Sequence, residues 1–179
     1  MSAGTVVGIS VYPVRGCAGT SLQRADVGPA GLAGDRTHTV VDVTGRVLRG
    51  RDAPALAGVT PTGHPDLDAA AVSAAVGAPV RLEPRSGRPD GSAAVHLVSR
   101  QALDRAAEGA VPDGCSPEDP RANLVLDLAD GEDERTWVGH LARISGVTLE
   151  ITRTPKHCLG VYASVWATGT VSVGDPVLL

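Results

Sequence analysis

The sequence predicts a mainly β, barrel-like fold. Short runs rich in β-branched residues recur along the chain, and turns that carry Gly and Asp separate them. Patterns of helical period are few and short, and the chain has no internal repeat, heptad pattern or low-complexity tract. Many short strands with few helices are typical of barrels.

The first 60 residues are expected to be mostly sheet. Residues 5–12 form a β-favouring run that should end at Pro13, because proline has no backbone N–H to donate to a strand ladder. A β-hairpin is predicted from residues 37–43 and 46–48, around the pair Thr44-Gly45, whose glycine tolerates a positive φ.

Residues 61–93 are predicted to connect two β parts. They are rich in Pro, Gly and Ala, Asp66 is a possible N-cap for a short helix that reaches Ala75, and residues 86–91 resemble an exposed loop.

Residues 94–179 are expected to form the second β part. A strand from Ala94 leads to Ser99, which should cap a helix over residues 100–107 that Gly109 and Pro112 end. We expect the segments 1–60, 61–93 and 94–179 to form one compact unit. Further strands are predicted over residues 123–128, 147–152, 161–166 and 170–178.

Composition excludes several classes of protein. The chain has 179 residues and no apolar run long enough to span a bilayer, so no membrane partner is expected. Its 16 basic and 20 acidic residues are mixed along the chain and give a net charge of −4, which argues against nucleic acid as a partner. The N-terminal residues lack the features of a secretory signal, so we expect a cytoplasmic protein.

Common catalytic and metal motifs are missing from the sequence. The five histidines are scattered without a zinc-binding pair, and no nucleophile elbow, Walker loop or dinucleotide fingerprint occurs in its required context. Cys17, Cys115 and Cys158 are an odd number of cysteines without a CxxC pair, which favours thiols in a reducing compartment.

Cys158 has the best surroundings for chemistry. Lys156 and His157 can supply positive charge that stabilises its thiolate. A thiolate can bind a soft metal, attack an electrophile or carry a persulfide. An isolated cysteine in a β protein is more often a small buried apolar residue, so both interpretations stay open at this point.

Arg15, Arg36 and Arg121 are candidate oxyanion-binding residues. Each lies beside a turn-like segment, where a guanidinium group and exposed backbone N–H groups can bind a phosphate together. Each one taken singly is more often a solvated or ion-paired arginine.

Ordered segments of the chain resemble the MOSC family, which is named for the C-terminal domain of molybdenum cofactor sulfurase. Residues 9–17 (ISVYPVRGC), 31–36 (GLAGDR) and 51–56 (RDAPAL) resemble the N-terminal β-barrel part of MOSC proteins. The resemblance implies a MOSC-type β-barrel with an N-terminal β subdomain and a few short helices. The segments that resemble the MOSC domain proper are 97–99 (LVS), 120–125 (PRANLV), the region of Trp137, 157–158 (HC) and 169–177 (GTVSVGDPV).

The resemblance implies a pterin-based molybdenum cofactor in a cleft between the two β parts, with Cys158 as the thiolate that binds molybdenum. Relatives such as the mitochondrial amidoxime-reducing component reduce N-hydroxylated substrates with electrons from partner proteins. This chain has no iron–sulfur, flavin or NAD motif, so an external donor such as a ferredoxin, flavoprotein or cytochrome is expected. The family motifs assign cofactor binding to Arg15, Gly16, Arg36, Ser92, Arg121, Lys156 and His157.

Three features depart from the family pattern. Arg15 replaces the usual lysine, and His157 stands where arginine is frequent. Many relatives have tens of residues between the ligand cysteine and a Leu-Gly-Val-Tyr-Ala segment, whereas residues 159–163 here follow Cys158 directly. Two alternatives therefore remain: a sulfur carrier that uses a Cys158 persulfide, and a shortened MOSC fold that acts without cofactor in a specialised pathway.

Overall fold

The computed structural model describes residues 2–85, 93–111, 120–156 and 158–179. They belong to two units, which are described separately. The barrel unit comprises Met1–Ser10, Ser21–Ala33 and Pro89–Leu179, and the small unit comprises Val11–Thr20 and Gly34–Arg88. This grouping differs from the boundaries expected at residues 60 and 93.

Seven strands of the barrel unit close into a ring, which confirms the mainly β, barrel-like fold. Their order is β14-β10-β11-β12-β8-β9-β1, and β14 pairs again with β1. The pairings in the ring are antiparallel except that of β8 with β9. The strands are β1 (Ser2–Val11), β8 (Val95–Ser99), β9 (Leu124–Leu128), β10 (Leu141–Ile144), β11 (Val147–Arg153), β12 (Val161–Ala167) and β14 (Pro176–Leu178).

The C-terminal run expected as one strand over 170–178 forms two. A turn at Gly174, with φ of 96°, separates β13 (Gly169–Ser172) from β14, and the Asp175 carboxylate accepts the Ser172 N–H at 2.8 Å. The two strands then join different sheets, since β13 pairs with β3 (Arg24–Gly28) and β14 pairs with β1 and β10. The remaining strands of this unit are β4 (Gly31–Leu32), which pairs with β3, and β2 (Thr20–Leu22), which follows β1 in the larger sheet and starts at the unit boundary.

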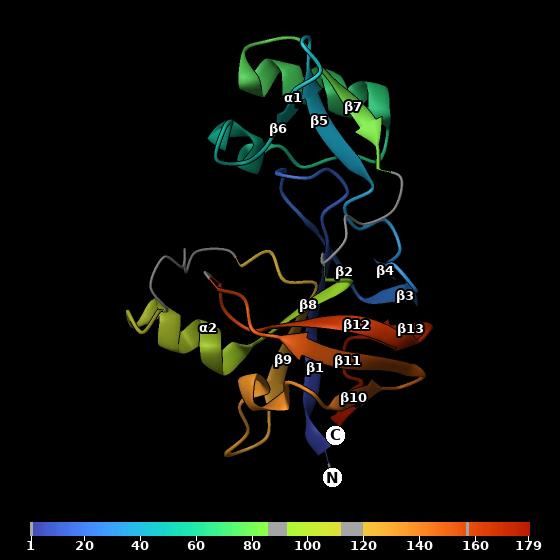
Figure 1. Cartoon of the computed structure of the whole chain (residues 1–179), viewed down its shortest axis with the longest axis vertical. Coiled ribbons are helices and arrows are strands. Elements are labelled where there is room, and N and C mark those ends of the chain that lie inside the picture. Colours follow the sequence, from blue (N-terminus) through green and yellow to red (C-terminus); the bar gives the residue numbers. More distant parts are fainter. Residues whose placement is uncertain (1, 86–92, 112–119, 157) are drawn as a thin grey trace. The chain divides into compact units, whose positions relative to one another are not determined.

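Helix α2 (Arg100–Ala107) packs against β8 and β9 (Figure 1). Its bounds and its cap agree with the sequence prediction: the Ser99 hydroxyl accepts the backbone N–H of Ala102 at 3.0 Å. The buried side chains of Ala102 and Ala106 contact Val98 and Leu159 in one apolar cluster. The segment containing α2 leads from β8 to the parallel strand β9, as a parallel pair requires. A short 3-10 helix, η2 (Glu134–Trp137), precedes β10.

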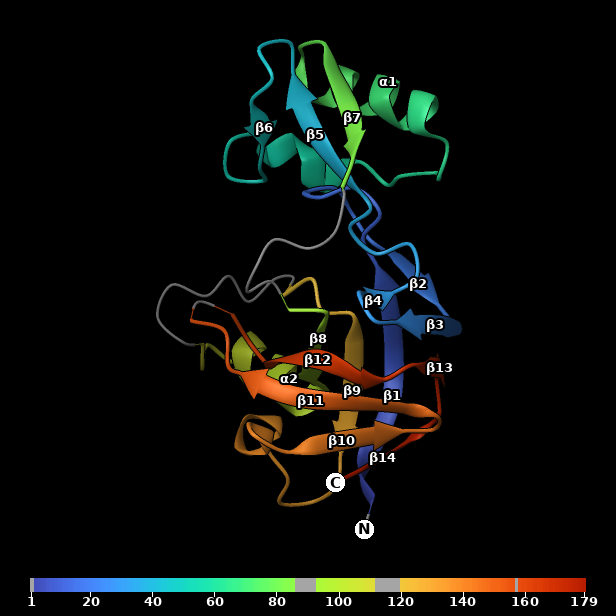
Figure 2. The ribbon, with the colours of Figure 1, turned by 45° about the vertical axis from the view of Figure 1, so that its right-hand side comes forward.

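The small unit is built around β5 (His38–Asp42). This strand lies between β6 (Val47–Leu48) and β7 (Val80–Pro84), and α1 (Pro65–Val76) packs against β7 (Figure 2). The 3-10 helix η1 (Pro54–Gly58) also contacts α1. Part of the segment 61–93, expected as a connector with a short helix, thus contributes both a helix and a strand to this unit. Its core contains Val14, Cys17, Val40, Ala53, Leu56, Val59 and Val72.

The N-terminus of α1 lies earlier than the sequence predicted. His64 is the N-cap and Pro65 the first helical residue, so the assignment of the cap to Asp66 was wrong. Proline at this position has its φ preset for the helix and lacks only an N–H that would find no partner there.

The hairpin of β5 and β6 forms as predicted but with a longer loop. The Asp42 N–H donates to the carbonyl oxygen of Arg46 at 3.0 Å, and the Asp42 carboxylate accepts the backbone N–H of Thr44 at 2.8 Å. Residues 43–46 lie between the ends of the two strands, with Gly45 at φ of 86°. Neither α1 nor α2, the two α-helices of the described residues, is long and apolar enough to cross a membrane.

Candidate functional site

The structure assigns the predicted site residues to both units. Arg15, Gly16 and Arg36 belong to the small unit, and Arg121, Lys156 and Cys158 belong to the barrel unit. The predictions for Ser92 and His157 lie outside the described residues. The barrel-unit and small-unit residues are described in turn.

Cys158 lies in the segment between β11 and β12 and is half-buried. Its thiol Sγ lies 3.7 Å from the carbonyl oxygen of Pro120, within hydrogen-bonding range for sulfur. The fold thus brings Cys158 beside the Pro120-Arg121 segment, 38 residues earlier in the chain. A thiolate has no hydrogen to donate, so a metal–sulfur bond at Cys158 would release the Pro120 carbonyl. Lys156, two residues before Cys158, has an exposed side chain.

The two residues after Cys158 are fixed in place. The Nε2 atom of buried His96 lies 2.8 Å from the carbonyl oxygen of Leu159, and only the ring nitrogen can be the donor in this pair. Gly160 has φ of 76°, and a Cβ there would overlap the carbonyl oxygen of Leu97. Residue 160 must therefore be glycine for both conformational and steric reasons.

His96 is a residue that the sequence did not single out. It stands opposite Tyr162 in the β8–β12 register, and the two ring centroids are 4.8 Å apart. The Arg153 guanidinium carbon lies 5.2 Å from the centroid of the Tyr162 ring, within the range of a cation–π contact. No local motif marks His96, because its partners Leu159, Tyr162 and Asn123 lie far from it in the sequence.

Arg36 and Arg121 share an uncommon backbone conformation. Their φ angles are 51° and 52°, and the other non-glycine residue with positive φ among those described is Ser145. A left-handed conformation costs a non-glycine residue roughly 1 kcal/mol relative to glycine. Positive φ at a non-glycine residue is uncommon, and two of the three such residues described are predicted site residues.

Arg36 is held by its neighbours in the small unit. Its Nη1 bonds the carboxylate of buried Asp35, and its backbone N–H donates to the carbonyl oxygen of Tyr12 at 2.8 Å. The other oxygen of the Asp35 carboxylate accepts the Tyr12 N–H at 2.9 Å. Arg36 thus presents a fixed guanidinium group whose charge Asp35 partly balances.

Arg15 lies in a strongly basic environment. Its backbone N–H donates to the carbonyl oxygen of His38 at 3.0 Å, and the residue keeps an exposed surface. Partial burial of the guanidinium group, followed by the positive charges of Arg85, Arg49 and Arg36, holds the pKa of Arg15 below its ordinary value. Arg49 and Arg85 were not among the predicted site residues. Arg49, beside Gly50, could have been found by the criterion that selected Arg15.

Gly16 also lies where a side chain would be disfavoured. Its φ is 95°, and a Cβ there would lie 3.0 Å from Cδ1 of Leu56. The backbone of Gly16 therefore lies close to the small-unit core, directly after Arg15 in the chain.

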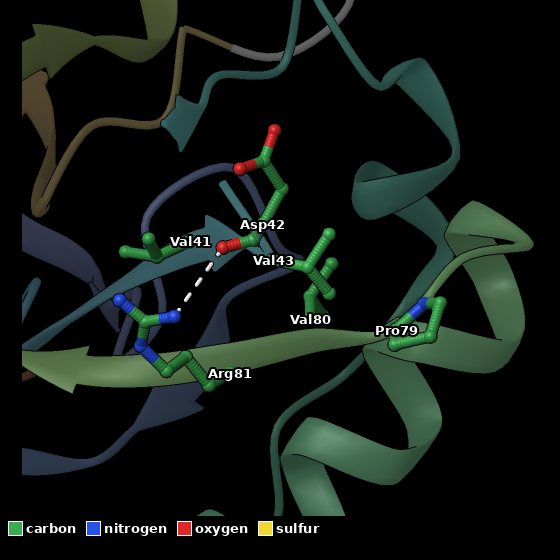
Figure 3. Close-up of a pocket in the computed structure, with 6 residues that line it drawn as sticks. All are labelled: Val41, Asp42, Val43, Pro79, Val80 and Arg81. Atoms are coloured by element: carbon green, nitrogen blue, oxygen red, sulfur yellow. Dashed lines mark hydrogen bonds between the residues drawn. The ribbon is translucent and has the colours of Figure 1, made fainter. Parts of the chain in front are cut away.

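A surface pocket of about 160 Å³ lies elsewhere on the small unit (Figure 3). It is lined by residues of β5, the turn after it and the start of β7, and Arg81 donates to the Asp42 carbonyl oxygen at 3.4 Å. None of the predicted site residues lines this pocket, so it does not form the candidate site.

Taken unit by unit, the donors fit parts of an anionic cofactor: the small unit offers the guanidinium groups of Arg15 and Arg36, and the barrel unit offers that of Arg121 and the Cys158 thiol. Arginine guanidinium groups suit phosphate and other oxyanions, and a cysteine thiolate suits a soft metal. Within the described ranges, no three His, Cys, Asp or Glu side chains gather as a metal site.

The family model of the MOSC N-terminal beta barrel domain matches residues 3–111. No curated protein matches the chain significantly. Among solved structures, the YuaD protein from Bacillus subtilis is 15% identical, with a TM-score of 0.57 over 99% of this chain and 94% of that one. A second structure, described as a hypothetical protein, is 14% identical, with a TM-score of 0.52 over 98% of this chain and 68% of that one. At these identities the two structures support the fold alone.

Proposed function

Because the chain belongs to the MOSC N-terminal beta barrel domain family, we propose that it binds a pterin-based molybdenum cofactor and reduces N-hydroxylated or N-oxygenated compounds. The contact between Cys158 and Pro120 carries this proposal, because it joins the only candidate metal ligand of the resemblance to the segment of Arg121.

The proposal gives the residues of each unit their own role. In the small unit, Arg15, Gly16 and Arg36 are the candidates for binding an anionic group. In the barrel unit, Arg121 is the candidate. Cys158 binds the metal, and Lys156 adds positive charge nearby. The left-handed backbone of Arg36 and Arg121 supports these roles, since a residue without a needed side chain would favour glycine there.

When bound, the cofactor would supply the two-electron redox chemistry that this reduction needs. Reduction of an N–OH group to N–H takes two electrons and two protons and releases water. The chain's own residues hold the cofactor: His96 and Gly160 fix the backbone after Cys158, so that the sulfur keeps one position. Electrons come from a separate ferredoxin, flavoprotein or cytochrome, in the reducing cytoplasm.

Metal and pterin analysis tests the proposal. The full chain, produced in a host that makes the cofactor, should contain molybdenum and pterin in equal amounts. Cys158→Ser should lose most of the molybdenum but keep pterin, because the arginines remain. Cys17→Ala is the matched control, since Cys17 is a fully buried core residue of the small unit and its replacement should leave the molybdenum content per folded protein unchanged.

Two results would contradict the proposal. Wild-type protein with neither molybdenum nor pterin would favour the shortened fold that acts without cofactor. Equal molybdenum in wild type and Cys158→Ser would remove Cys158 as the metal ligand.

A persulfide on Cys158 is the second candidate function. It is favoured by accessibility, because Cys158 is half-buried whereas Cys17 is fully buried. Mass spectrometry after treatment with a cysteine desulfurase and free cysteine should find an added sulfur on the Cys158 peptide. Its appearance on Cys17 or Cys115 instead would argue against this role.

A further inference from the structure

Three arginines of the small unit come together from separate segments of the chain. Arg15 and Arg85 flank the start of β5: the Arg15 N–H donates to the His38 carbonyl oxygen at 3.0 Å, and the Arg85 N–H donates to that of Thr37 at 2.8 Å. Adjacent strands lie roughly 5 Å apart, so both residues are within one strand spacing of the same backbone.

Arg49 lies in the turn after β6, close to the segment that contains Arg15. A Cβ at Gly16 would lie 3.6 Å from the backbone nitrogen of Gly50, so the Arg49-Gly50 segment lies against the residue that follows Arg15. The charge of Arg49 acts on Arg15 together with those of Arg85 and Arg36.

Nearby carboxylates are engaged with other groups. Asp35 pairs with Arg36, Asp52 with Arg46 at 3.1 Å, and Glu83 with Arg81 at 2.7 Å. The other oxygen of the Asp52 carboxylate accepts the Arg49 backbone N–H at 3.1 Å. The ion pairs among the described residues do not include Arg15, Arg49 or Arg85. Guanidinium groups gathered without an ion pair repel one another, and a bound anion would remove this cost.

We propose that Arg49 and Arg85 join Arg15 as the binding site of a doubly charged phosphate group, that of a phosphate monoester. A monoester carries a charge of about −1.5 to −2 near neutral pH, which suits three guanidinium groups better than the single charge of a diester does. The inference deepens the proposed function and rests on it where the phosphate is the terminal group of the cofactor. Free phosphate has the same chemistry, and the experiments below distinguish the two sources.

Calorimetric titration of the full chain tests the site directly. Protein from a host that cannot make the pterin is titrated at pH 8 with inorganic phosphate and with dimethyl phosphate, a singly charged diester. Arg49→Ala and Arg85→Ala should each raise the Kd for inorganic phosphate about tenfold, equivalent to about 1.4 kcal/mol. Arg81→Ala removes the same charge from the same unit at a residue paired with Glu83, and it should leave the Kd within about twofold.

Circular dichroism monitors the folding of each variant. Arg49→Lys and Arg85→Lys are milder changes that keep the positive charge, and these variants should bind phosphate more tightly than the alanine variants. The inference is overturned if wild type binds no phosphate, if dimethyl phosphate binds as tightly as phosphate, or if Arg49→Ala and Arg85→Ala behave as Arg81→Ala does.

A separate measurement, the pterin content of protein from a cofactor-producing host, identifies the source of the phosphate and tests the proposed function. Pterin lost from Arg49→Ala and Arg85→Ala assigns the site to the cofactor, and unchanged pterin assigns it to free phosphate. Wild type that binds phosphate through these residues but contains no molybdenum or pterin would overturn the proposed function and leave this inference standing.

Discussion

His96 donates a hydrogen bond from Nε2 to the carbonyl oxygen of Leu159, 2.8 Å away, across 63 residues of sequence. This bond ties the buried strand β8 to the residue that follows Cys158, and packing of the His96 ring against Tyr162 supports it. The position of the candidate metal ligand therefore depends on the interior of the barrel unit.

Replacing His96 should loosen the Cys158 segment. His96→Ala leaves a buried carbonyl oxygen without its donor, which should lower the free energy of unfolding by about 1–3 kcal/mol. Alkylation of Cys158 by iodoacetamide, followed by peptide mass spectrometry, should become faster. His140→Ala, at an exposed residue of the same unit, is the control and should change neither quantity. Equal alkylation rates in wild type and His96→Ala would show that the bond does not restrain Cys158.

Gly160 should tolerate no side chain. In Gly160→Ala the new Cβ would overlap the Leu97 carbonyl oxygen at a residue with φ of 76°, so we expect a loss of more than about 3 kcal/mol or failure to fold. Gly174→Ala is the matched control, because Gly174 has φ of 96° with open space around its Cβ position, and only the conformational cost of about 1 kcal/mol should appear. Urea denaturation compares the two, and similar losses would contradict the steric argument.

The Arg121 residue should lower the stability of the fold but contribute to pterin binding. At φ of 52°, Arg121→Gly should be about 1 kcal/mol more stable than Arg121→Ala in urea denaturation, while both variants contain less bound pterin than wild type. Ser145→Gly, at the same φ but on an exposed turn, should gain stability without any change in pterin content. Full pterin content in Arg121→Gly would show that the guanidinium group is not needed.

Asp68 should make the stability of the small unit depend on pH. Burial raises the pKa of its carboxyl, but hydrogen bonds from the Thr62 N–H and hydroxyl and from the Gly63 N–H outweigh burial and hold the pKa below the ordinary value of 3.8. A depressed pKa in the folded state contributes stability above pH 3.8 that is lost as pH falls through the folded-state value.

The measurement is urea denaturation of wild type and Asp68→Asn from pH 7 down to pH 3. The Asn amide nitrogen cannot accept the Gly63 N–H, so the variant should be less stable at pH 7, and the difference should shrink below pH 3.8. A difference that is constant across this range would show that the carboxylate charge contributes nothing.

Local signals in the sequence were sufficient for several elements. Ser99 before the helix over 100–107 was predicted as a cap and is one, because an N-cap depends only on residues within one turn. Strands β11 and β12 were likewise predicted within one residue of their ends. In contrast, the N-terminus of α1 was misplaced, since Asp66 resembled a cap while the carboxylate that organises the turn is that of Asp68.

The amino-acid sequence by itself determined the mainly β class and the family resemblance. It also selected Cys158 as a candidate metal ligand and Arg15, Arg36 and Arg121 as candidate oxyanion-binding residues, because these choices follow from residue type and local order. Only the tertiary structure decided that β14 returns to β1, that His96 binds the Leu159 carbonyl, and that Arg49 and Arg85 act on Arg15. Such pairings join residues tens of positions apart, and their free energy depends on burial and distance, which no local pattern of residues specifies.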